Sequence, residues 1–124
     1  MFIMEELPVI VYFIRLFEID YKIKFTVLIL VSLIINQILK NYIAEKRPEK
    51  YHNHSYGMPS GHAHILWFIA FYKITETNIY LRASLIMFAI ASSIQRLYSE
   101  KHTKKQVIMG GLLGMITGIL ASKI

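Results

Sequence analysis

Five apolar stretches alternate with polar clusters along the chain, covering residues 7–19, 23–43, 63–74, 79–97 and 106–124. The second is long enough, at 1.5 Å of rise per residue, to cross about 30 Å of hydrocarbon as one helix. The first is short and carries Arg15 and Glu18, which predicts a tilted or partly interfacial helix. The pattern predicts an all-α fold: a polytopic transmembrane bundle of about five helices, forming a single domain over residues 1–124.

Three glycines in the last stretch predict how its helix packs. Gly110, Gly114 and Gly118 recur at four-residue spacing. In a soluble helix each glycine would cost about 1 kcal/mol relative to alanine. In a membrane bundle the same spacing forms a face on which a neighbouring helix can lie close. We therefore expect these glycines to have a structural role.

The composition favours a membrane protein. Hydrophobic residues make up 55% of the chain and the mean hydropathy is +0.44, above the usual level for a soluble domain. The absence of cysteine excludes disulfides and thiolate chemistry. The formal net charge of +6 would suggest nucleic acid in a soluble protein. Here the cations lie between apolar runs, so we expect lipid headgroups or a phosphorylated substrate as partners, and no nucleic acid.

The two most polar connections are expected on the same side of the membrane, because two crossings separate them. Each holds a polar cluster that begins at the end of the second or the fourth apolar stretch. The first contains Lys40 and Arg47-Pro48, cations that could by themselves snorkel to the headgroups. Pro48 biases Arg47 toward an extended backbone. The second contains Arg96 and His102, which alone could form an interfacial pair, although ionisable residues near a membrane often mark function.

A third cluster, Pro59-Ser60-Gly61-His62, directly precedes the third apolar stretch. Ser60 is suited to cap a helix, and Gly61 allows a close backbone approach. The N–H groups of the first helical turn would then suit an anion, with His62 beside it as a proton carrier. The alternative is an ordinary capped helix start.

Taken in order, these clusters resemble the three-part signature of the type 2 phosphatidic acid phosphatase (PAP2) superfamily. The resemblance covers about residues 40–110. Two positions depart from the family pattern, since Gln95 and Gln106 stand where serine and aspartate are usual. Family members commonly have six helices, one more than the stretches found here, and a homo-oligomer remains open.

Gln106 narrows the resemblance to one branch. It follows His102 by four residues, so we expect its side-chain oxygen to accept the Nδ1–H bond of His102. The surrounding residues, Leu97-Tyr98, His102-Thr103 and Gln106-Val107 with Gly110, are similar to the dolichyl-diphosphate phosphatase branch, where glutamine is part of the pattern.

The resemblance implies an activity with named roles. His102 would attack phosphorus to give a phosphohistidine, and His62 would act as acid and then as base. The phosphate would be held by Lys40, Arg47, Ser60, Gly61 and Arg96. The substrate would be a polyprenyl or dolichyl diphosphate, cleaved to the monophosphate and inorganic phosphate. The resemblance implies no metal and no cofactor, and an integral, multi-pass protein of an endoplasmic reticulum-type membrane if the dolichyl branch holds.

Four alternatives stay open, of which one, a small channel or assembly protein, leaves the ordered motifs unexplained. The substrate could be phosphatidic acid or another lipid phosphate, or the chain could bind a lipid phosphate without catalysis. A haem or metal protein would use the extra histidines, His52, His54 and His64. They lack carboxylates or cysteines at ligand spacing, so we expect them in a solvated loop or in support of the site residues.

Overall fold

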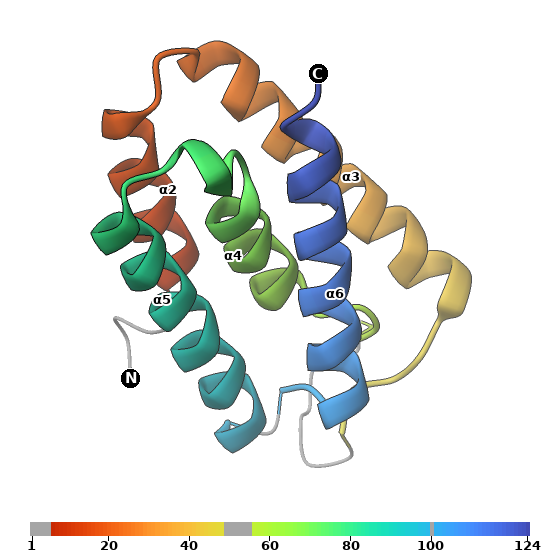
Figure 1. Cartoon of the computed structure of the whole chain (residues 1–124). Helices are drawn as coiled ribbons and strands as arrows, with labels where there is room; N and C mark the ends of the chain where they lie inside the picture. The colour runs from red at the N-terminus through yellow and green to blue at the C-terminus, as the bar shows by residue number, and fades with distance from the viewer. Residues whose placement is uncertain (1–5, 49–55, 100) are drawn as a thin grey trace.

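The computed structural model describes residues 6–48, 56–99 and 101–124. Over these residues the chain is helical (Figure 1). The helices are α2 (Leu7–Glu18), α3 (Lys22–Ile43), α4 (Gly61–Phe71), α5 (Ile79–Tyr98) and α6 (Lys104–Ala121), with a 3₁₀ turn at Ile74–Glu76. The predicted all-α class and the five helical segments are confirmed for the described part of the chain.

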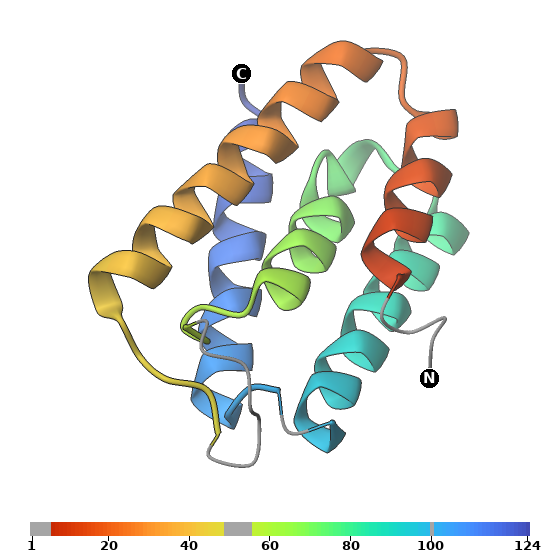
Figure 2. The ribbon, with the colours of Figure 1, turned by 180° about the vertical axis from the view of Figure 1, so that it is seen from behind.

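The helices alternate in direction, so α3 and α5 end where α4 and α6 begin (Figures 1 and 2). Helix α4 lies in the middle of the molecule and contacts each of the other four helices. Its first turn is therefore surrounded by the ends of α3, α5 and α6. As the count of crossings predicts, the two polar connections lie at one end of the bundle.

The close packing of α4 on α6 depends on the glycine face. A Cβ atom built on Gly110 would lie 2.5 Å from the carbonyl oxygen of Ser60, and one on Gly118 would lie 2.7 Å from that of Phe68. Gly114 meets the backbone of His64 in the same way. These separations are shorter than any real carbon contact, so the predicted packing role of the three glycines is confirmed.

Side chains close several helix ends. Ser60 caps α4 by accepting a hydrogen bond from the Ala63 N–H at 3.3 Å. At the other end of α4, the buried Arg15 of α2 donates from Nη2 to the carbonyl of Tyr72 at 2.6 Å. A cation at a helix C-terminus also interacts favourably with the helix dipole.

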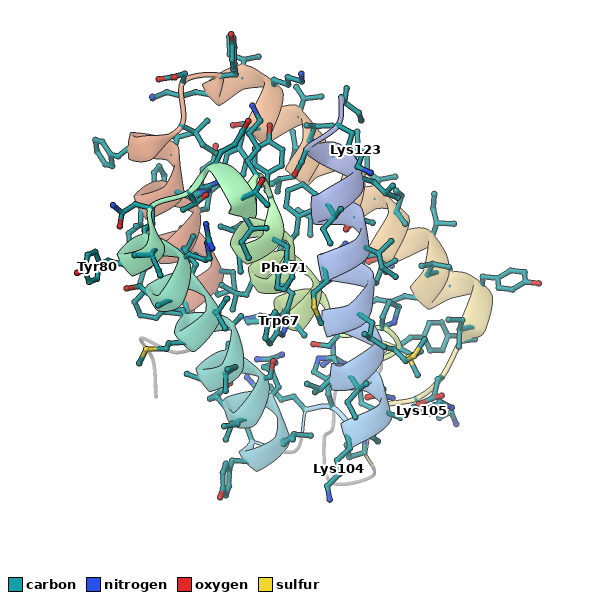
Figure 3. All side chains as sticks on the ribbon, in the orientation of Figure 1. Trp67, Phe71, Tyr80, Lys104, Lys105 and Lys123 are labelled. Atoms are coloured by element: carbon teal, nitrogen blue, oxygen red, sulfur yellow. The ribbon has the colours of Figure 1, made fainter. Side chains whose placement is uncertain are left out.

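Besides its hydrophobic core, the bundle buries polar side chains and exposes large apolar ones. Its buried polar side chains include Ser32, Asn36, Lys40, His64, Arg96, His102 and Gln106. Large apolar side chains point outward along α3 and α6, for example Ile23 and Ile108. Lysines mark the two ends of α6 in Figure 3, with Lys104 and Lys105 at one end and Lys123 at the other. Among the described helices, α3 is long and apolar enough to cross a membrane.

Candidate active site

The connection from α3 to α4 returns on itself before α4 begins. The Gly57 N–H donates to the carbonyl of Glu45 at 2.9 Å, and Lys46 and Tyr56 form an antiparallel bridge. Gly57 is enclosed by this return: an added Cβ would lie 2.9 Å from Cγ of Arg47 and 2.5 Å from Oε1 of Gln106. Glycine at position 57 allows this close approach. Arg47 therefore lies beside the backbone of Gly57.

The two ring nitrogens of His102 have different partners. Nδ1 lies 2.9 Å from the Gly57 carbonyl oxygen, which can only accept, so Nδ1 carries the proton in this bond. Nε2 lies 3.1 Å from Nη1 of Arg47, which can only donate, so Nε2 presents its lone pair. His102 is therefore held in one tautomer, with its unprotonated nitrogen directed at a cation.

His102 is a neutral base at physiological pH. Burial lowers its pKa to about 3, with further contributions from the guanidinium groups of Arg47 and Arg96. The hydrogen bond to Gly57 acts in the opposite direction, because it stabilises the protonated ring. A buried, neutral imidazole with an unprotonated nitrogen can act as a nucleophile once a substrate replaces the hydrogen bond from Arg47.

Arg47 approaches His102 from the connection after α3, and Arg96 approaches it from the end of α5. Arg47 also donates from Nη1 to the carbonyl of Lys101 at 3.0 Å, which ties the two connections together. Arg96 lies in the last turn of α5 and is buried, with 4% of its surface exposed. Its carbonyl accepts the N–H of Lys101 at 3.3 Å. Two guanidinium groups therefore flank one imidazole.

Lys40 brings a third cation to the start of α4. Its ammonium group donates to Oδ1 of Asn36 at 2.9 Å and to the carbonyl of Pro59. A Cβ built on Gly61 would lie 3.8 Å from Nζ of Lys40, an ordinary contact. Nothing in the described chain crowds Gly61 closely, so its expected tight backbone approach is not needed for packing. A small side chain at this position would fit.

The cap of α4 is joined to α6. The Ser60 N–H donates to the carbonyl of Gln106 at 3.1 Å, and the Ser60 side chain is fully buried. Its hydroxyl oxygen accepts from Ala63, and its O–H remains a donor. His62 is half-buried in the first turn of α4. The predicted residues of all three clusters therefore meet at one end of the bundle.

Gln106 does not hold His102, so the predicted hydrogen bond between them is wrong. His102 precedes α6, which begins at Lys104, so helical spacing does not bring the two side chains together. Gln106 Oε1 accepts the Thr103 N–H at 3.0 Å in a capping box. Its Nε2 donates to Oε1 of Glu45 at 3.0 Å and to the carbonyl of Lys46 at 2.8 Å. Gln106 instead hydrogen-bonds to the connection between α3 and α4, which also contains Arg47 and Gly57.

Several residues of the site were missed from the sequence. Asn36 and Ser32 precede Lys40 by four and eight residues, so the three form a polar stripe on an otherwise apolar helix. This spacing could have identified Asn36 and Ser32 from the sequence. Glu45 and Gly57 carry no such signal, because their position depends on how the connection folds back. His64 is fully buried against this stripe, whereas His52 and His54 lie outside the described residues. Within the described part of the chain, no group of three or more His, Cys, Asp or Glu side chains could hold a metal ion.

Three cations around a buried, neutral histidine can stabilise the negative charge of a phosphoryl group. The family comparison agrees with this chemistry. The PAP2 superfamily model matches residues 21–124. The chain therefore belongs to the PAP2 superfamily.

Named relatives narrow the comparison. Dolichyldiphosphatase 1 of Homo sapiens is 30% identical and that of Dictyostelium discoideum is 29% identical, each match covering 68% of this chain and 44% of the relative. The chain thus spans less than half the length of the curated relatives it matches. The predicted superfamily and its predicted branch are both supported by these similarities. No solved structure matches the chain significantly.

Proposed function

We propose that this protein is a membrane lipid phosphatase that hydrolyses a polyprenyl or dolichyl diphosphate to the monophosphate and inorganic phosphate. The main support for the proposal is the orientation of His102. Its Nδ1 donates a hydrogen bond to the Gly57 carbonyl, and its Nε2 lone pair faces Arg47. The similarity to dolichyldiphosphatases favours a lipid diphosphate as the substrate. It also extends the proposal to an endoplasmic reticulum-type membrane.

In the first step, Nε2 of His102 attacks the terminal phosphorus and the bond from phosphorus to the bridging oxygen breaks. The terminal phosphate takes over the hydrogen bond that Arg47 now directs at His102, which frees the Nε2 lone pair. His62 gives its proton to the departing monophosphate. Lys40 pairs with phosphate charge that is present from substrate binding onward, while Arg47 and Arg96 also stabilise the negative charge that spreads over the phosphoryl oxygens.

In the second step, water attacks the phosphohistidine and the phosphorus–nitrogen bond breaks. His62 takes the proton from water, so it returns to its starting state. Inorganic phosphate leaves and Nε2 of His102 regains its lone pair. Throughout both steps Nδ1 keeps its proton, and the Gly57 carbonyl supports the positively charged ring of the intermediate. Three fixed cations supply the charge stabilisation in this scheme, which proceeds without a metal.

The outward apolar faces support a multi-pass arrangement. On α5 and α6, as on α3, large apolar side chains are exposed while polar ones are buried, for example Met87 against Gln95. In water such a surface would be costly, whereas lipid removes the cost. The site would then lie at one membrane face, where a lipid can present its diphosphate while its chain stays in the bilayer.

The decisive experiment measures phosphate release from a short polyprenyl diphosphate by the purified protein, with EDTA present. His102→Asn is the matched control, because its amide can still donate to the Gly57 carbonyl but provides no nucleophilic nitrogen. We expect release by the wild type and only background release by the variant. Equal release by both proteins would overturn the proposal, and binding without release would indicate a lipid-phosphate binder. Phosphatidic acid, tested in parallel, decides between the two lipid classes.

A further inference from the structure

A series of buried polar side chains leads from Lys40 into the centre of the bundle. Ser32, Asn36 and Lys40 form a stripe on α3, and His64 of α4 packs against it with none of its surface exposed. Nδ1 of His64 lies 3.0 Å from Nδ2 of Asn36, and Nε2 lies 2.5 Å from Oγ of Ser32. Buried polar groups in an apolar bundle are costly unless they are satisfied, so this series has a defined arrangement.

The direction of each hydrogen bond follows from the donors. Nδ2 of Asn36 can only donate, so Nδ1 of His64 accepts and the ring carries its proton on Nε2. Nε2 then donates to Ser32, whose hydroxyl donates to Oγ1 of Thr117 at 3.3 Å. Thr117 in turn donates to the carbonyl of Leu113 at 2.7 Å. Each donor in the series therefore faces an acceptor when His64 is neutral and carries its proton on Nε2.

This arrangement fixes which end of the Asn36 amide faces Lys40. Since Nδ2 is directed at His64, Oδ1 faces the ammonium group of Lys40 at 2.9 Å. Together with the carbonyl of Pro59, it holds that ammonium group beside the first residue of α4, Gly61. Nδ2 of Asn36 also contacts the carbonyl of Pro59, but at the longer distance of 3.5 Å. Without the closer acceptor at His64, the amide could turn its NH₂ group toward Lys40. Two donors would then face each other, and Lys40 would lose one of its two acceptors.

We propose that His64 is a positioning residue that acts through Asn36 to hold Lys40 at the phosphate-binding end of α4. The inference rests on the proposed phosphatase function and identifies a determinant of its affinity for phosphate. His64 itself need not touch the substrate. Because Lys40 would contact the phosphate in both the ground state and the transition state, its displacement should act mainly on KM.

The test uses the purified full chain and a short polyprenyl diphosphate, with kcat, KM and inhibition by inorganic phosphate measured for each variant. His64→Leu removes the acceptor, while His64→Asn keeps a side-chain carbonyl that can accept from Asn36. We expect His64→Leu to raise KM about tenfold, the size expected for directly coupled neighbours, with kcat little changed. We expect His64→Asn to recover much of this loss.

A double-mutant cycle separates positioning from a general loss of packing. If His64 acts through Asn36, then His64→Leu should raise KM no further in an Asn36→Leu background. Ser93→Ala is the matched control, because it removes another half-buried hydrogen bond, from Trp67 at 3.2 Å, that does not lead to Lys40. The inference is wrong if His64→Leu lowers the melting temperature but leaves KM unchanged, or if its effect on KM persists without Asn36.

A second readout does not depend on activity. If the wild type releases no more phosphate than His102→Asn, the proposed function fails, and the arrangement around His64 is then tested by ¹⁵N NMR of the labelled histidine. We expect a neutral ring with its proton on Nε2, and a change in the Nδ1 signal in Asn36→Leu. A proton on Nδ1 in the wild type would overturn the inference by itself.

Discussion

Nδ1 of His102 donates its hydrogen bond to a neutral backbone carbonyl, where many catalytic histidines have a carboxylate partner. A carbonyl fixes the tautomer and the ring orientation, as the Gly57 oxygen does at 2.9 Å. It does less than a carboxylate to stabilise a charged ring, so the imidazole stays a weaker base. Burial and the neighbouring cations lower the pKa of His102 to about 3, and the hydrogen bond to Gly57 offsets this only in part.

The low pKa of His102 makes the fold sensitive to acid. The folded pKa of about 3 lies below the ordinary value of 6.5, so between these values the unfolded chain binds the extra proton. The stability contributed by neutral His102 is therefore complete above pH 6.5 and is lost as the pH falls toward 3. At pH 5 the loss should be about 2 kcal/mol. Thermal unfolding in detergent at pH 7 and pH 5 should show a smaller decrease for His102→Asn than for the wild type.

Gln106 is expected to be intolerant of an acid. Gln106→Glu preserves the shape of the side chain but replaces both hydrogen-bond donors of Nε2, which now serve Glu45 and Lys46. A carboxylate would then face that of Glu45, whose pKa is held below its usual range chiefly by the hydrogen bond from Lys105. We expect a loss of about 1–3 kcal/mol in stability and a lower phosphate-release rate.

The compensating substitution is Glu45→Gln, which supplies an amide opposite the new carboxylate. The double variant should regain much of the stability and rate lost in Gln106→Glu, as measured by thermal unfolding and by kcat. Full activity of Gln106→Glu alone would contradict the role assigned to the hydrogen bonds from Gln106 of α6 to the connection between α3 and α4.

At the scale of helices, the sequence pattern was sufficient for the scaffold. The apolar stretches predicted the five helices of the described residues, and Ser60 predicted the start of α4, because these features depend on residues close in sequence. The partner of Gln106 could not be found this way. The position of Gln106 depends on α6 beginning only at Lys104, and that of Glu45 depends on a connection that folds back to pair Glu45 with Gly57. Residue spacing along the sequence predicts neither feature.

The glycine face of α6 offers a matched pair of substitutions. Gly110→Ala would press a methyl group into the backbone of Ser60, at the start of α4, whereas Gly118→Ala would press one into the backbone of Phe68, remote from the site. Overpacking of this kind costs about 1–3 kcal/mol, so both variants should melt at lower temperature. Because Ser60 is one of the residues predicted from the sequence to hold the phosphate, we expect only Gly110→Ala to raise KM as well. Equal effects of the two variants on KM would contradict this assignment.

For the whole molecule, the main consequence of the alternating helices is that the two connections carrying the site share one end of the bundle (Figures 1 and 2). In the proposed multi-pass arrangement, this end and the opposite end lie on different sides of the membrane. The chain contains no cysteine, so a single introduced cysteine reports its own location without background. Tyr56 and Lys104 are exposed at the site end, while Asp20 and Glu76 are exposed at the opposite end.

Each single-cysteine variant, Tyr56→Cys, Lys104→Cys, Asp20→Cys and Glu76→Cys, would be reconstituted into sealed vesicles and treated with a membrane-impermeant thiol reagent. Orientation can be mixed, so the two members of a pair are compared with each other and with the total measured after detergent is added. We expect equal labelled fractions for Tyr56→Cys and Lys104→Cys, and the complementary fraction for Asp20→Cys and Glu76→Cys. If all four variants label completely in sealed vesicles, the helices do not cross the bilayer and the multi-pass arrangement is wrong. Phosphate release measured on the same vesicles then shows whether the diphosphate is hydrolysed on the side that Tyr56 and Lys104 define.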